Sequence, residues 1–386
     1  SDTIGAALVF ACVFAHLVGH GAKLLADPDT LWHIETGAWI WREKRFPWTD
    51  PFSHTFAGHA WIAKEWLSQL LLFAAKSLAG WTGVVVLTAA SMAALIGLCF
   101  SWFVGRCRTL LALVLALLVF VLLAPHALAR PHVFAFLPLF IWTKSLIDAA
   151  DSGRPPPLWL LPVIVLWANL HGSYPIAYPI AALLGFEAVL RASAGKRKEA
   201  IVGWGTFVAL ALAAGCVTPY GIHAFLLPFT MAEGHEAVPL ILEWQPLDWA
   251  PVSLLARGIA ILFLIGLVAG GWRNAIRVLL VALVAGLMLR HSRFLDVFAI
   301  VAPLAAAGPI AERFPDFAPR RDAPRWPVLE RVGLACILAA AIATIALSSP
   351  APGPKTHPVA ALAAARQAGI SGPVYNSYNL GGFMIA

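Results

Sequence analysis

Charged residues are scarce in this chain, and their scarcity excludes an ordinary soluble protein. Only 12% of the 386 residues are Asp, Glu, Lys or Arg, whereas a soluble domain carries about a quarter. The five cysteines are scattered and include no CxxC pair, so neither a disulfide framework nor a zinc knuckle is expected. The sequence also lacks a P-loop, a GxSxG motif and an HExxH motif, and therefore gives no sign of nucleotide-driven chemistry.

Apolar residues make up 60% of the chain, in runs of roughly 20 residues without the alternation of barrel strands. This pattern predicts an all-α polytopic membrane protein with about 11–13 transmembrane helices. The net charge of +7 fits cytoplasmic anchoring and contact with lipid headgroups, so membrane lipids are expected partners and nucleic acid is not.

The stretch Asp27–Trp66 is polar, charged and aromatic, and it lies between two apolar segments. A connection of this length suggests a function, and we predict that residues 26–61 form an external catalytic loop. Within it, Thr30–Lys44 carries apolar residues on one helical face, which predicts a helix lying flat in the membrane interface. Its many tryptophans suit the membrane–water boundary.

Asp27, Asp29 and His33 are the sharpest chemical feature of this loop. On a helix Asp29 and His33, four residues apart, share a face. Carboxylates and an imidazole there could bind a divalent cation such as Mg or Mn, or one carboxylate could act as a general base. Alternatively, Asp27 or Asp29 merely caps the helix that starts near Thr30.

Further polar side chains interrupt apolar segments or end the loop, and we take them as candidate substrate-binding residues. Each has a structural alternative: an interfacial anchor, a snorkelling arginine, a helix–helix hydrogen bond or a topology signal. With His33, the candidates are Lys64, Glu65, Arg130, His132, Asn169, His171, Glu243 and Arg293. Glu243 belongs to another long polar loop, residues 232–251.

The sequence divides into a transmembrane domain, residues 1–348, and a final segment, residues 349–386. The latter combines a Pro-rich linker, a helix over Ala360–Ala368 and a strand over Pro373–Tyr375, which is typical of a small soluble extracytoplasmic α/β domain that continues past residue 386. The basic loops 191–198 and 313–325 should face the cytoplasm. The catalytic loop then lies outside if a segment near residues 110–135 or 160–180 does not span fully.

Several motifs together resemble the GT-C superfamily of polytopic glycosyltransferases, more narrowly a group of bacterial membrane proteins of that type. The similarity spans most of the chain. It is carried by DPDTLWHIETG, WTDPFSHTFAGHAWIAKEW, ARPHVFAF, WANLHGSY, TPYG and VYNSYNLGGFMIA.

The resemblance implies an inverting enzyme of the bacterial inner membrane, with its active site on the periplasmic face. Its donor would be a polyprenyl-phosphate sugar, and its acceptor a lipid, glycan or protein. It implies that Asp27 or Asp29 is the catalytic base and that Arg130 or Lys64 grips the donor phosphate. Metal dependence varies in the superfamily. The chain lacks a clear second Asp-x-Asp in a later loop, where Glu243 is the nearest substitute.

Two other classes of function remain open at this point. Asn169, His171 and broken helices would also suit a transporter or flippase of a lipid-linked substrate, although no inverted repeat is evident and the long loop would have no role. A structural assembly subunit would not need so many ionisable groups at the interface.

Overall fold

The computed structural model describes residues 2–232, 241–319, 327–372 and 374–385, and these residues form helices and connecting loops without any strand. Parts of the expected loops 232–251 and 313–325, namely residues 233–240 and 320–326, lie outside the described residues. An isolated bridge between Thr49 and Ala60 closes the loop before α4. The prediction of an all-α protein is therefore confirmed for the described residues.

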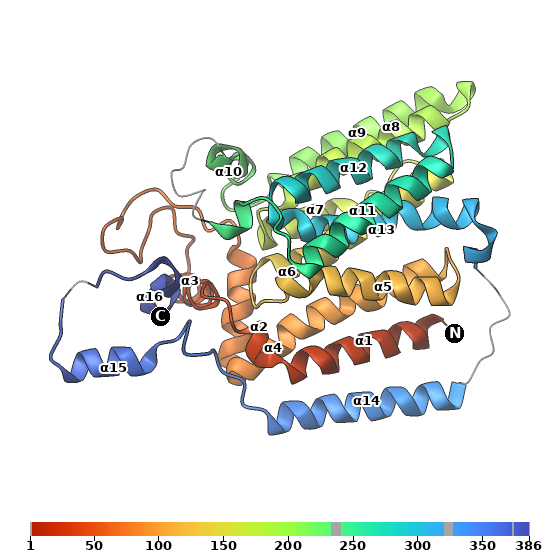
Figure 1. Ribbon diagram of the computed structural model, residues 1–386. Helices are drawn as coiled ribbons and strands as arrows, with labels where there is room; N and C mark the ends of the chain where they lie inside the picture. Colours follow the sequence, from red (N-terminus) through yellow and green to blue (C-terminus); the bar gives the residue numbers. More distant parts are fainter. Residues whose placement is uncertain (1, 233–240, 320–326, 373, 386) are drawn as a thin grey trace.

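Long apolar helices build a bundle whose members run lengthwise in Figure 1. In the described part of the chain, eight helices are long and apolar enough to cross a membrane. They are formed by α4 (Trp66–Val104), α5 (Thr109–Leu123), α6 (His132–Ser152), α9 (Arg197–Gly215), α11 (Pro251–Ala269), α12 (Ala275–Arg290), α13 (Leu295–Arg313) and α14 (Pro327–Leu347), of which α5, α9, α12 and α13 are each lengthened by an adjoining 3-10 turn. The shorter α1 (Asp2–Gly19), α7 (Leu160–Leu170) and α8 (Ala177–Arg191) run beside them. The polytopic membrane architecture is supported, while the count of 11–13 spans stays a prediction.

A layer of crosswise helices covers one end of this bundle. In Figure 1, α3 (Thr30–Glu43) and α10 (Ile222–Ala232) are seen end-on at the left of the lengthwise helices. Residues 66–78 of α4 also run crosswise, and the helix breaks at Ala79 and Gly80, whose φ is 60°. The helix predicted over Thr30–Lys44 is thus present, across the bundle as expected.

The break in α4 adds a short segment that the expected topology did not include, because residues 66–78 do not run along the bundle. The incomplete span expected near 110–135 or 160–180 stays a prediction; α7, which lies in the second range, runs lengthwise but has only 11 residues. With the added segment, the α4–α5 and α8–α9 connections fall at the same end, opposite to α3. Both connections are rich in Arg and Lys.

The crosswise layer is held by close backbone approach. A Cβ at Gly37 of α3 would collide with the backbone carbonyl of Gln69 and with Phe73 in α4. Only a glycine lets these two helices lie so near each other, and this contact places α3 directly on residues 66–78.

The C-terminal segment returns to the same end of the bundle. It contains α15 (Val359–Gln367) and α16 (Gly381–Ile385), and α16 packs on α3. A Cβ at Gly382 would collide with the Pro28 carbonyl oxygen. The helix expected at Ala360–Ala368 is confirmed. The strand expected at Pro373–Tyr375 is absent at Val374 and Tyr375, and Pro373 lies outside the described residues. The α/β character is therefore not shown.

Candidate functional site

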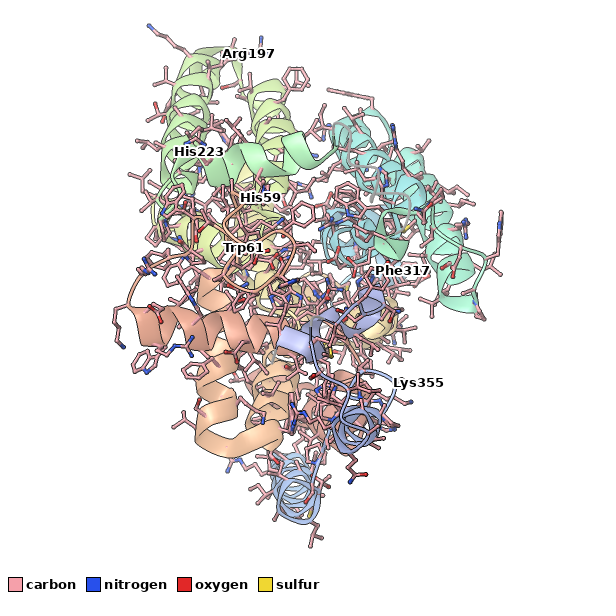
Figure 2. All side chains as sticks on the ribbon, turned by 90° about the vertical axis from the view of Figure 1, so that its left-hand side faces the viewer. His59, Trp61, Arg197, His223, Phe317 and Lys355 are labelled. Carbon is pink, nitrogen blue, oxygen red and sulfur yellow. The ribbon has the colours of Figure 1, made fainter. Side chains whose placement is uncertain are left out.

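A cavity of about 520 Å³ opens where the crosswise layer meets the bundle. Figure 2 looks onto this end, with Trp61 over its middle. Its walls come from segments distant in sequence. The polar and aromatic lining is Asp29, Trp32, His33, Trp61, Lys64, Glu65, Gln69, His126, Arg130, His132, His171, Ser173, Glu243, Trp244, Arg293 and Asp296. Most of the candidates predicted from sequence therefore meet in one place.

The turn Asp27-Pro28-Asp29 is locked before α3 begins. The Asp27 carboxylate accepts the backbone N–H of Asp29 at 2.8 Å. One residue further, the Thr30 hydroxyl donates to the Ala129 carbonyl at 3.1 Å, and the Ala129 N–H donates to Leu24 at 2.8 Å. These bonds join the turn to the loop that carries Arg130.

The two acids of this turn have different positions. Asp27 is 4% exposed and lies behind the cavity wall, whereas Asp29 lines the cavity. Among the described residues, the Asp29 side chain makes no capping hydrogen bond to α3. Asp29 therefore does not act as a helix cap, and it is the acid that a bound molecule would meet.

Arg130 pairs with three acids from two distant segments of the chain. Its Nη2 lies 3.0 Å from Asp29 Oδ2 and its Nη1 lies 3.4 Å from Asp27 Oδ2, and Nη1 also pairs with Glu243 Oε1. A guanidinium suits this task because its fixed fork can bind several carboxylate oxygens at once. Arg130 was predicted to bind the donor phosphate, but these three acids already neutralise its charge.

Burial and charge act on this cluster in opposite directions. Burial raises the pKa of Asp27 to about 6, although the positive charge of Arg130 opposes the shift. Burial alone would lower the pKa of Arg130, but Asp27, Glu243 and Asp29 raise it above its usual value. Arg130 therefore stays charged, while Asp27 titrates close to neutral pH.

Lys64, Glu65, His171 and Ser173 form the facing wall. His171 Nε2 lies 3.3 Å from Glu65 Oε1, and His171 Nδ1 lies 2.8 Å from the Ser173 hydroxyl. The backbone N–H of Ser173 donates to Nδ1 at 3.2 Å, so Nδ1 is the acceptor and Nε2 carries the proton toward Glu65.

Desolvation sets the charges on this facing wall. Burial lowers the pKa of Lys64 and of His171 and raises that of Glu65. His171 is thereby kept neutral at ordinary pH. The Lys64 side chain lies over Gly172, where an added Cβ would come within 3.0 Å of it.

His33 and His132 also line the cavity, and the Trp244 indole packs against Arg293. His33 is 2% exposed, its Nδ1 lies 3.4 Å from Gln69 Nε2, and burial lowers its pKa well below the usual value. His132 Nε2 donates to the His126 carbonyl at 2.8 Å. On the rim, the Arg293 guanidinium stacks over Trp244 at 4.5 Å. This stacking fixes a cation beside an aromatic face.

Asn169 does not reach this cavity. It accepts the Trp66 indole N–H at 2.7 Å and donates to the Val217 carbonyl at 2.8 Å, which ties α7 to the start of α4. It lines a separate, mostly apolar cavity of about 800 Å³ together with Trp66 and Leu166. Among the described contacts, Asn169 therefore forms hydrogen bonds between helices, the structural role considered for it above, and does not line the candidate site.

Several residues of the cavity were not among the site residues predicted from the sequence: Trp32, Trp61, Gln69, His126, Ser173, Trp244 and Asp296. Asp296 lies three residues after Arg293, in the first turn of α13, and Ser173 lies two residues after His171. Their closeness in sequence to predicted site residues could therefore have indicated them. Gln69 carried no such signal, because only the crossing of α3 over α4 brings it to His33.

The cavity offers few side chains that are placed to bind a divalent cation. Among the described residues, no group of three or more His, Cys, Asp or Glu side chains is placed to hold a metal ion. Asp29 is paired with Arg130, and His33 is engaged with Gln69. Asp29 and His33 do not form a ready-made site, and the predicted Mg or Mn dependence stays a prediction.

Comparison with protein-family models, with curated protein sequences and with solved structures gives no match to this chain.

Proposed function

We propose that this chain is an inverting, membrane-embedded glycosyltransferase of the GT-C type. The donor is a sugar on polyprenyl phosphate, and the acceptor hydroxyl belongs to a lipid, glycan or protein. The observation that carries the proposal is the cavity at the crosswise end of the bundle, whose lining brings together the carboxylates Asp29, Glu65 and Glu243 and the cations Lys64, Arg130 and Arg293. Transfer of a sugar from a lipid phosphate needs both kinds of group at the membrane boundary.

Asp29 is the general base in this proposal. It lines the cavity, while Asp27 accepts its backbone N–H from behind. Asp29 takes the proton from the acceptor hydroxyl as the acceptor oxygen bonds to the anomeric carbon. The bond from that carbon to the phosphate oxygen breaks, and the polyprenyl phosphate leaves with the electron pair.

Lys64 and Arg293 hold the leaving phosphate. Both line the cavity, and Trp244 positions Arg293 by stacking. Arg130 is already balanced by Asp27, Asp29 and Glu243, so its role is to position the base. Placing fixed cations where negative charge develops lowers the barrier without reorganisation.

The surroundings of the cavity fit a lipid-linked donor. Trp32, Trp61 and Trp244 offer indole faces of the kind that pack against sugars. The Arg- and Lys-rich connections at the opposite end favour a cytoplasmic location for that end. The cavity then opens on the periplasmic side of the bacterial inner membrane.

The test uses purified full-length protein with radiolabelled polyprenyl-phosphate sugars and membrane extract as the source of acceptor. Asp29→Asn should lower transfer by about a hundredfold or more, as expected for loss of a general base. Glu35→Gln is the matched control, since Glu35 lies on α3, the helix that Asp29 precedes, and does not line the cavity. Repeating the assay with EDTA tests metal dependence.

The outcomes separate the proposal from its rival. Label that moves to a new covalent product with wild type and Glu35→Gln, but not with Asp29→Asn, supports the enzyme. Label that crosses a vesicle membrane without any new product supports a transporter or flippase instead. Full activity in Asp29→Asn would refute the assignment of the base.

A further inference from the structure

The opposite end of the bundle carries another polar cavity, of about 430 Å³, at the corner where α8 meets α9. Its basic side chains come from two connections and one helix end: Arg154 from the α6–α7 turn, Lys196 from the α8–α9 turn and Arg191 from the end of α8. Its apolar wall includes Ala188 and the buried Trp204. The cavity is remote from the site described above, which lies at the crosswise end.

The walls of this cavity are fixed by packing and by a buried ion cluster. A Cβ at Gly203 would lie 2.8 Å from the Pro155 ring, so the α6–α7 turn sits directly on α9. Beneath the cavity, Arg277 Nε lies 3.1 Å from Glu187, and both side chains are 1% exposed. Such a paired cluster resists rearrangement because separating it would leave an unpaired buried charge.

Arg191 is held in place by this cluster. It pairs with Glu187, its Nη1 lies 3.5 Å from Asp151 Oδ1, and its Nη2 donates to the Arg273 carbonyl at 3.0 Å. Asp151 in turn pairs with Arg277. These acids are thereby already matched by arginines.

Arg154 and Lys196 differ from Arg191 in this respect. Within the described part of the chain, neither side chain has an ion-pair partner, and both are exposed at the cavity. Glu199 is the remaining acid on the lining. The cavity therefore presents excess positive charge over an apolar floor, which suits a phosphate on a glycerol-like group.

We propose that this corner cavity binds the phosphate headgroup of an anionic phospholipid, with Arg154 and Lys196 as the phosphate ligands and the apolar wall against the glycerol. The proposal does not depend on the activity of the other site, because it concerns binding alone. Free phosphate shares the charge of the headgroup, so the experiment includes it as a separate arm.

The test is native mass spectrometry of the full chain in detergent, titrated with phosphatidylglycerol, phosphatidylcholine or inorganic phosphate. Phosphatidylglycerol should bind more tightly than phosphatidylcholine. The double variant Arg154→Ser with Lys196→Ser should bind it about thirtyfold more weakly, since each basic side chain close to an anionic headgroup contributes roughly fivefold.

A matched control removes the same charge from the same basic run. Arg197→Ser with Lys198→Ser alters residues that do not line the cavity, and should change binding by less than about twofold. Glu199→Gln should tighten binding, which keeps the proposal testable even if the first double variant folds poorly. Equal losses in both double variants, or equal binding of the two lipids, would overturn the proposal. Tight binding of inorganic phosphate alone would indicate a free-phosphate site and overturn the lipid assignment.

Discussion

Arg130→Gln tests whether one guanidinium holds the candidate site together. The substitution removes the partner of Asp27, whose side chain is 5% exposed, and of Asp29 and Glu243, which are 28% and 40% exposed. Asp29 and Glu243 are only half-buried and can recover water, so the main cost comes from Asp27. Leaving a buried carboxylate without its partner typically costs about 3–5 kcal/mol.

Protonation limits this cost. The pKa of Asp27 is about 6 beside Arg130, and without that positive charge it rises further. At neutral pH the folded variant then keeps the carboxyl protonated, while the unfolded chain ionises it. Stability is lost as pH rises through this range, and we expect a deficit of roughly 2–4 kcal/mol near pH 7.5 that shrinks toward pH 5.

Thermal unfolding in detergent at both pH values measures the effect. Arg106→Gln is the control, because Arg106 pairs with a half-buried carboxylate, Asp148, at side-chain exposures of 26% and 35%. Water can reach Asp148 once its partner is removed, so this loss should be smaller than that at Asp27 and should not depend on pH between 5 and 7.5. Adding Asp27→Asn to Arg130→Gln should recover part of the loss. A deficit that is equal at the two pH values, or absent at both, would refute the reasoning.

Other predictions follow from single contacts. Gly382→Ala should lower the proposed sugar transfer several-fold by pushing the Pro28 carbonyl and its turn out of place; Gly381→Ala, whose Cβ would make only an ordinary contact of 3.6 Å with Asn376, is the matched control and should leave transfer unchanged. Gly37→Ala should destabilise the fold by about 1–3 kcal/mol in thermal unfolding, because its Cβ collides with backbone in α4; unchanged stability would contradict the close crossing. Asp27→Asn should gain stability relative to wild type by up to roughly 3 kcal/mol as pH rises from 4 to above 6, since the folded pKa is raised from 3.8 to about 6; parallel pH profiles would show that Asp27 is not buried as described.

The fold class could be predicted because composition and helix length are local properties. Long apolar runs leave a helix as the way to satisfy backbone hydrogen bonds in lipid. The periodicity of Thr30–Lys44 likewise predicted α3, which begins at Thr30 and ends at Glu43. The break in α4 was harder to place, since residues 66–104 form one long run that is apolar apart from a few polar side chains such as Gln69 and Lys76. Their crosswise direction depends on the conformation at Gly80 and on the packing of α3.

The sequence by itself determined that this chain forms apolar helices, that a polar aromatic loop separates the first two, and which side chains could carry chemistry. Tertiary structure alone decided how these side chains pair. Arg130 pairs with Asp27, 103 residues before it, and with Glu243, 113 residues after it. Asn169 points away from the candidate site and accepts the hydrogen bond of the Trp66 indole. The physical reason is that a charged or amide group in an apolar setting must find a partner, and only the packing of the helices determines which partner is within reach.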